Sequence, residues 1–202
     1  MKKNVLTFAM CFLLLQGYSQ NSLLKLIKSE GGISKQYTEI PQHLQPVFTA
    51  RGLSAALGLP NKASLVLYST ETDNLGFTHY RFEQTYAGIP IENSMFIAHV
   101  KNGKVVSVSG TIVTDFNAAI DQRLAAKSIL DKDAIKKAIQ FVNAKAYAWE
   151  DPAMEALIKE QSKNAKASYF PTISKVWYND GAGINPSALR LVYKVDVYAT
   201  DP

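Results

Sequence analysis

Apolar and polar residues alternate through the middle of the chain, which is the pattern of half-buried β-strands. The expected strands are Leu65–Thr70, Phe77–Tyr86, Ile91–Val100 and Lys104–Thr111. Asn102-Gly103 favours a tight hairpin between the last two strands, because both residues tolerate positive φ. Pro90 cannot donate a backbone hydrogen bond, so Gly88-Ile89-Pro90 is expected to interrupt the ladder. The pattern predicts an antiparallel meander.

The spacing of apolar residues becomes helical after residue 130. Apolar positions recur on one helix face from Ile135 to Val142 and predict a helix that begins near Asp131. Pro152 suits the first turn of a second, weaker helix. Strands are expected at Ile173–Tyr178 and Leu189–Tyr198, on either side of a glycine-rich loop. We therefore predict an α+β fold, in which an antiparallel β meander precedes helices packed on an antiparallel sheet.

Two segments show weaker patterns. Residues 20–50 are polar and contain Gly31-Gly32, Pro41 and Pro46, so an extended lead-in with little regular structure is expected. Thr49 at its end is placed to cap a short helix from Ala50 to Leu57. Residues 115–127 have the composition of a linker, although their alanines also suit a helix.

Residues 1–19 have the three parts of a secretory signal peptide. Lys2 and Lys3 supply the positive start, Leu6–Leu15 is the apolar segment, and small residues predict cleavage between Ser19 and Gln20. An N-terminal core helix is the alternative. The apolar run is too short to span a membrane, so a secreted chain that leaves the membrane after cleavage is expected.

Composition and charge exclude several classes of function. The chain has 22 Lys and Arg against 17 Asp and Glu, and loss of Lys2 and Lys3 with the signal lowers the net charge from +5 to +3. The basic residues form no cluster, so no nucleic-acid partner is expected. The single cysteine, Cys11, leaves with the signal. A mature chain without cysteine has no disulfide, thiolate metal site or thiol nucleophile.

No spacing of residues in the sequence indicates catalysis or metal binding. The three histidines are far apart in sequence, and the motifs of zinc peptidases, serine hydrolases and phosphate-binding loops are absent. His79 and His99 fall on expected strands and can face each other as ordinary, partly buried side chains, with a ligand or acid–base role as the alternative. Carboxylate pairs at Asp131 with Asp133 and at Glu150-Asp151 are expected at helix starts, where negative charge suits the helix dipole.

One stretch carries a recognisable family motif. Residues 76–91, Gly-Phe-Thr-His-Tyr-Arg-Phe-Glu-Gln-Thr-Tyr-Ala-Gly-Ile-Pro-Ile, closely resemble the fungalysin/thermolysin propeptide (FTP) motif, and the likeness continues to Gly110. The second half resembles a PepSY domain through the helical Ala-Ile-x-x-Ala-Ile at 134–139 and the strand Leu189–Val195. After the signal peptide predicted at 1–19, the resemblance implies an FTP domain with an extended lead-in at 20–120 and a PepSY-like domain at 121–202, truncated at its C-terminus.

The resemblance singles out residues with a fold or docking role, and none with a catalytic, cofactor-binding or metal-binding role. They are Gly76, His79, Arg81, Phe82, Gln84, Tyr86, Gly88, Pro90, His99, Gly103 and Gly110. Gln84 is expected on the apolar strand face with its amide bonded to backbone, because an unpaired buried amide costs about 1–3 kcal/mol. Gly88–Val100 either docks on a protease, with Pro90 keeping one edge open, or only shapes a bend.

The resemblance also implies a function. Such pro-regions precede a secreted zinc metallopeptidase, act as its intramolecular chaperone and inhibitor, and are removed by proteolysis. The implied partner is the cognate metallopeptidase domain in the same precursor, and zinc and calcium would belong to that domain. This chain is expected to be a monomer without cofactor and without activity of its own. The alternative is a stand-alone secreted protease inhibitor or binding module.

Overall fold

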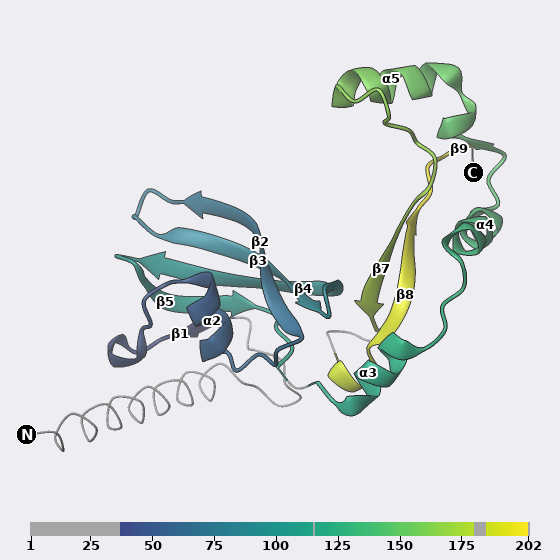
Figure 1. Ribbon diagram of the computed structural model, residues 1–202. Coiled ribbons are helices and arrows are strands. Elements are labelled where there is room, and N and C mark those ends of the chain that lie inside the picture. Colours follow the sequence, from purple (N-terminus) through teal and green to yellow (C-terminus); the bar gives the residue numbers. More distant parts are fainter. Residues whose placement is uncertain (1–36, 115, 180–184, 202) are drawn as a thin grey trace, which may run out of the picture. The chain divides into compact units, whose positions relative to one another are not determined.

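The structure, a computed structural model, describes residues 37–114, 116–179 and 185–201 (Figure 1). The expected signal peptide and most of the expected glycine-rich loop lie outside these residues. The fold is α+β and divides into two compact units. One unit comprises the chain up to Arg123 together with Trp177–Arg190, and the other comprises Leu124–Val176 with Leu191–Pro202. No helix in the described ranges is long and apolar enough to cross a membrane.

The first unit is built on an antiparallel sheet with the strand order β1-β5-β4-β3-β2 (Figure 1). Four of its strands follow one another along the chain: β2 (Ala63–Thr72), β3 (Thr78–Tyr86), β4 (Ile89–Lys101) and β5 (Lys104–Gly110). Asn102 and Gly103 form the last hairpin turn with φ of 51° and 73°. The predicted meander and its Asn-Gly turn are confirmed.

The ladder between β3 and β4 corrects the expectation for Gly88-Ile89-Pro90. Ala87 and Gly88 form a tight turn with positive φ, and β4 begins directly afterwards, with Pro90 opposite Thr85. The interruption falls later, since the register moves from Pro90–Thr85 to Met95–Glu83. Proline is tolerated here because β5 pairs with β4 only over residues 96–101. The missing N–H of Pro90 therefore costs no hydrogen bond to β5.

The lead-in is also more regular than expected. Strand β1 (Tyr37–Glu39) pairs with the outer side of β5, and the 3-10 turn η2 (Gln42–Leu44) follows it. Val47 makes a further bridge to Lys104. These pairings join residues about 60 to 70 positions apart in sequence, so the local polar composition of the lead-in does not reveal them.

A hydrophobic core fills one face of this sheet. Helix α2 (Ala50–Ala56) packs there, and Thr49 caps it as predicted, accepting the Gly52 N–H at 2.9 Å. The core combines residues of the sheet, of α2 and of the segments before and after them: Ile40, Leu53, Ala56, Leu57, Phe82, Phe96, Ala98, Val100, Val105, Val108 and Ile112. The opposite face of the sheet carries the histidines of the family motif.

The expected linker contains helix α3 (Ala118–Ala125), so the helical alternative for residues 115–127 holds. Ile120 of α3 is buried, and Asp121 accepts hydrogen bonds from Tyr86 Oη at 3.0 Å and Lys62 Nζ at 2.9 Å. Trp177, at the end of β7 (Thr172–Tyr178), is fully buried and pairs with Ile91. Its indole N–H donates to the Tyr86 carbonyl at 3.1 Å.

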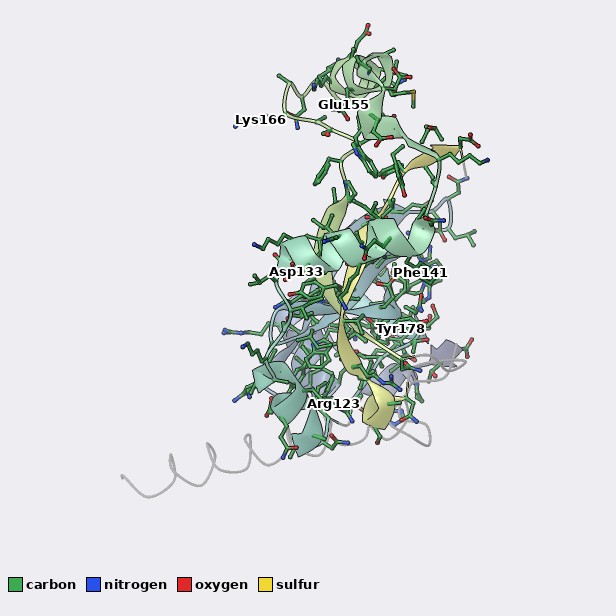
Figure 2. All side chains as sticks on the ribbon, turned by 90° about the vertical axis from the view of Figure 1, so that its right-hand side faces the viewer. Arg123, Asp133, Phe141, Glu155, Lys166 and Tyr178 are labelled. Atoms are coloured by element: carbon green, nitrogen blue, oxygen red, sulfur yellow. The ribbon has the colours of Figure 1, made fainter. Side chains whose placement is uncertain are left out.

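The second unit contains two of the expected helices, α4 (Asp131–Val142) and α5 (Pro152–Ser162). Its strands are β6 (Ala146–Tyr147), which pairs with β9 (Ala199–Asp201), and β8 (Arg190–Asp196), which pairs with β7. Asp151 caps α5 by accepting the Ala153 N–H at 2.8 Å. Phe141 lies at one end of α4 and is 91% exposed (Figure 2). Few side chains of this unit are buried.

Gln84 joins the sheet to the chain that leaves it. Its side chain is fully buried, its amide donates to the Val113 carbonyl at 2.6 Å, and its Oε1 accepts the Val113 N–H at 2.8 Å. Its own N–H donates to Ser94 Oγ at 3.2 Å, at the point where the register shifts. The predicted bond between the Gln84 amide and backbone is therefore confirmed.

Replacement of Gln84 by leucine is expected to lower the free energy of unfolding by about 2 kcal/mol or more, because both backbone groups of Val113 lose a buried partner. The matched control is Gln45→Leu, since the half-buried Gln45 makes a single bond to the Ile40 carbonyl at 3.0 Å. We expect the control to cost less than about 1 kcal/mol in urea unfolding. Equal losses for the two variants would contradict this role of Gln84.

Candidate functional site

The glycines of the family motif lie at turns and at one close approach of two strands. Gly76, Gly88 and Gly103 have φ of 78°, 75° and 73° in the three hairpin turns. Gly110, at the end of β5, has φ of 96°, and a Cβ placed there would lie 2.1 Å from the Met95 carbonyl oxygen. Any side chain at Gly110 would therefore push β5 away from β4.

Other motif residues stabilise the sheet from its two faces. Phe82 is part of the core, and the buried Tyr86 ring stacks on Phe116 with centroids 4.5 Å apart. Burial raises the pKa of Tyr86, and the hydrogen bond from Lys62 lowers the pKa of Asp121. On the opposite face Arg81 pairs with Glu71 at 3.1 Å.

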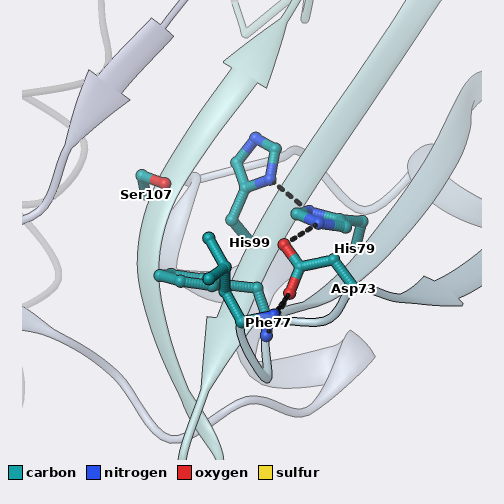
Figure 3. Close-up of a pocket in the computed structure, with 6 residues that line it drawn as sticks. Asp73, Phe77, His79, His99 and Ser107 are labelled. Carbon is teal, nitrogen blue, oxygen red and sulfur yellow. Dashed lines mark hydrogen bonds and ion pairs between the residues drawn. The ribbon is translucent and has the colours of Figure 1, made fainter.

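The two histidines of the motif meet on the face opposite the core. His79 of β3 is directly opposite His99 of β4, so both side chains point to the same side of the sheet. Their Nδ1 atoms are 2.7 Å apart, and a dashed line joins the two rings in Figure 3. His79 Nε2 lies 3.2 Å from Asp73 Oδ2, and His99 Nε2 lies 2.9 Å from Ser109 Oγ. The prediction that the two histidines face each other is confirmed.

Asp73, in the turn between β2 and β3, contacts His79 and begins a row of hydrogen-bonded side chains that continues through His99 to Ser109. Its Oδ1 accepts the N–H groups of Leu75 and Phe77, both at 2.9 Å, and its Oδ2 faces His79. These backbone hydrogen bonds, the one from Phe77 first, lower the pKa of Asp73. The ionised carboxylate is therefore the acceptor of a hydrogen bond from His79 Nε2–H.

This geometry limits the charge that the histidine pair can hold. When His79 is neutral and donates from Nε2 to Asp73, its Nδ1 accepts from His99 Nδ1–H, and His99 Nε2 accepts from Ser109. One added proton is still accommodated, because His79 Nδ1–H can then donate to His99 Nδ1 while His99 Nε2–H donates to Ser109 Oγ. A second added proton would set two N–H groups against each other at 2.7 Å. The pair therefore accommodates one positive charge and resists a second.

An open pocket of about 240 Å³ adjoins the pair and is lined by Asp73, Leu75, Phe77, His79, His99 and Ser107. Burial, together with the neighbouring His79 and Arg81, lowers the pKa of His99. Ser109 is placed like a nucleophile beside a base, but it lies within β5, opposite Ile97, and does not line the pocket. In the described part of the chain no three His, Cys, Asp or Glu side chains are arranged to hold a metal ion.

Four residues that contact the histidine pair or Tyr86 were not singled out by the sequence: Asp73, Ser109, Asp121 and Trp177. Asp73 is part of a turn sequence, in which an aspartate that accepts backbone N–H groups is common. Ser109 follows from strand register only once the pairing of β4 and β5 is known. Asp121 and Trp177 reach Tyr86 from elements distant in sequence, and no local pattern marks them.

Comparison with known proteins identifies the motif. Residues 63–112 match the Fungalysin/Thermolysin Propeptide Motif, a range that includes β2 to β5 and Gln84. The chain is 39% identical over 148 residues to a thermolysin of Alicyclobacillus acidocaldarius subsp. acidocaldarius, and 31% identical over 147 residues to the thermostable neutral protease NprT of Geobacillus stearothermophilus. A bacillolysin of Bacillus amyloliquefaciens is 34% identical over 70 residues.

These matches support a propeptide of the thermolysin type. The first two alignments cover 72% of this chain and 23% of each relative, so the chain spans about a quarter of the length of these proteases. Residues 63–112 are a fungalysin/thermolysin propeptide motif, and the sheet described above is its structure.

The stability of the folded chain is expected to depend on pH through His99. Because its folded pKa is lowered, the unfolded chain binds more protons below the ordinary histidine pKa of about 6.5. The contribution of His99 is complete above that pH and declines as the pH falls through it. The lowered pKa of Asp73 acts only near pH 4 and below. Urea unfolding at pH 8 and pH 5.5 measures the difference.

The His99→Asn variant is expected to lose most of this pH dependence. His43→Asn is the matched control, because His43 is exposed in η2 and away from the pair, and it should leave the pH dependence unchanged. A pH dependence that survives in His99→Asn would show that another group causes it.

Proposed function

We propose that this chain is the pro-region of a secreted zinc metalloendopeptidase precursor, in which it acts as intramolecular chaperone and inhibitor. The observation that carries the proposal is the propeptide motif at residues 63–112, within a longer likeness to thermolysins. In the proposal residues 20–120 are the FTP domain, and residues 121–202 are a PepSY-like domain. The chain itself has no catalytic role.

The construction of the first unit supports a chaperone role. Consecutive hairpins with tight turns pair residues that are near in sequence, and such local pairings form early in folding. Gln84 then fixes the exit of the chain at Val113 through a buried amide. A rigid sheet that forms first offers a surface on which a slower-folding peptidase can order its own strands.

In this proposal the peptidase domain lies in the same precursor, and zinc and calcium are bound by that domain. The chain would be exported with a signal peptide at residues 1–19 and would act as a monomer beside its peptidase. Linkage in one chain gives the pro-region a high effective concentration, which favours inhibition until proteolysis separates the two parts.

Refolding tests the proposal. The polypeptide encoded after residue 202 is denatured and refolded with or without residues 20–202. The proposal predicts that recovery of peptidase activity begins roughly tenfold faster with the chain, the effect of about 1.4 kcal/mol on a folding barrier. The recovered enzyme should then be inhibited by an equimolar amount of chain. The unstable Gln84→Leu variant should be less effective than Gln45→Leu.

Two results would contradict the proposal. One is a gene with no peptidase sequence after residue 202. The other is a peptidase whose refolding and activity do not respond to the chain.

A further inference from the structure

Strand β2 forms an open edge of the sheet. It is the last strand in the order β1-β5-β4-β3-β2, and no strand in the described ranges pairs with its outer side. It is ten residues long, whereas β1 at the other edge has three. An open edge of this length presents a row of backbone N–H and C=O groups to another extended chain.

Three adjacent apolar side chains are exposed on this edge: Val66 by 49%, Leu67 by 52% and Tyr68 by 65%. Val66 is opposite Glu83, on the face that carries the histidines. Leu67 is opposite the buried Phe82, on the core face, yet it remains half exposed. An incoming strand would therefore meet apolar contacts on both faces.

Charge and proline, two of the usual protections of an open edge, are missing from this part of β2. Residues 63–70 contain no charged side chain and no proline. The nearest charges are engaged at either end, Lys62 with Asp121 and Glu71 with Arg81. One irregularity is present: Tyr68 is a bulge residue, because the register with β3 shifts between Leu67 and Ser69. Residues 64–67 before it pair regularly with β3, and the absence of charge and proline leaves the outer side of residues 64–68 available to another strand.

The segment expected from the sequence to dock is less suited to this. Over residues 96–101 strand β4 is paired with β3 on one side and β5 on the other, so its backbone there offers no edge. The turn at Ala87 and Gly88 remains exposed, but it supplies no row of backbone groups.

We propose that residues 64–68 of β2 bind an extended segment of the peptidase in the same precursor, by adding it as a strand to the sheet. The inference rests on the proposed function, which supplies the occupant by placing a peptidase in the same precursor; the aligned region covers 23% of each of the two relatives, so most of each relative lies outside it. Backbone pairing would hold the segment, and apolar residues at alternate positions would contact Leu67 on one face and Val66 on the other.

Hydrogen exchange tests the pairing directly. The chain is measured alone and in complex with the polypeptide encoded after residue 202. The proposal predicts that amides within residues 64–68 exchange at least about tenfold more slowly in the complex, because an added strand protects them. Unchanged exchange there would overturn it.

Substitution tests the same edge through inhibition. Val66→Lys and Tyr68→Lys place a charge on the edge at exposed positions, and each should raise the inhibition constant at least about tenfold. The matched control is Val47→Lys, because Val47 is 70% exposed at the opposite edge of the sheet, and it should inhibit like the wild type. Circular dichroism and urea unfolding verify that all three variants fold.

The outcomes separate this inference from the function on which it rests. If the wild-type chain fails to bind the peptidase, both are wrong. If it inhibits and the two edge variants inhibit equally well, only the inference is wrong. A concentration-dependent dimer that Tyr68→Lys abolishes in sedimentation would assign the edge to a second copy of this chain and would also overturn it.

Discussion

The Gln84 side chain imposes the strictest constraint in the first unit. A buried amide has to find partners, and here both come from the backbone of Val113, 29 residues further along the chain. This pair of hydrogen bonds fixes where the chain leaves β5, and α3 with Asp121 follows a few residues later. The position of Asp121 in turn completes the contacts of Tyr86 and Lys62. One polar residue in an apolar strand face thus joins the meander to the helix that follows it.

Most of the family motif serves the fold rather than chemistry. Its glycines make turns or allow β5 to approach Met95, Phe82 fills the core, and Arg81 pairs across two strands. The histidine pair is the part that could take part in chemistry, and its row of hydrogen bonds from Asp73 to Ser109 holds both rings in place.

Sequence patterns predict what depends on near neighbours. The Asn-Gly turn, the cap at Thr49, the cap at Asp151 and the facing of His79 and His99 all follow from spacing along the chain. Pairings between distant segments do not. Strand β1 and the burial of Trp177 against Tyr86 depend on residues about 70 to 90 positions away, and the register shift at Gln84 depends on Ser94. The place of Pro90 within β4 is not predictable from local sequence, because the effect of a proline depends on which neighbouring strand is present.

The proposal that the chain is a pro-region in cis is tested most directly by following the product of the complete gene. The secreted protein is purified at successive times and its chains are weighed by mass spectrometry. The account predicts a single precursor, which then yields residues 20–202 and a peptidase that purify together before the pro-region is degraded. Secretion of residues 20–202 as the final and only product would contradict it and would favour an independent inhibitor or binding module.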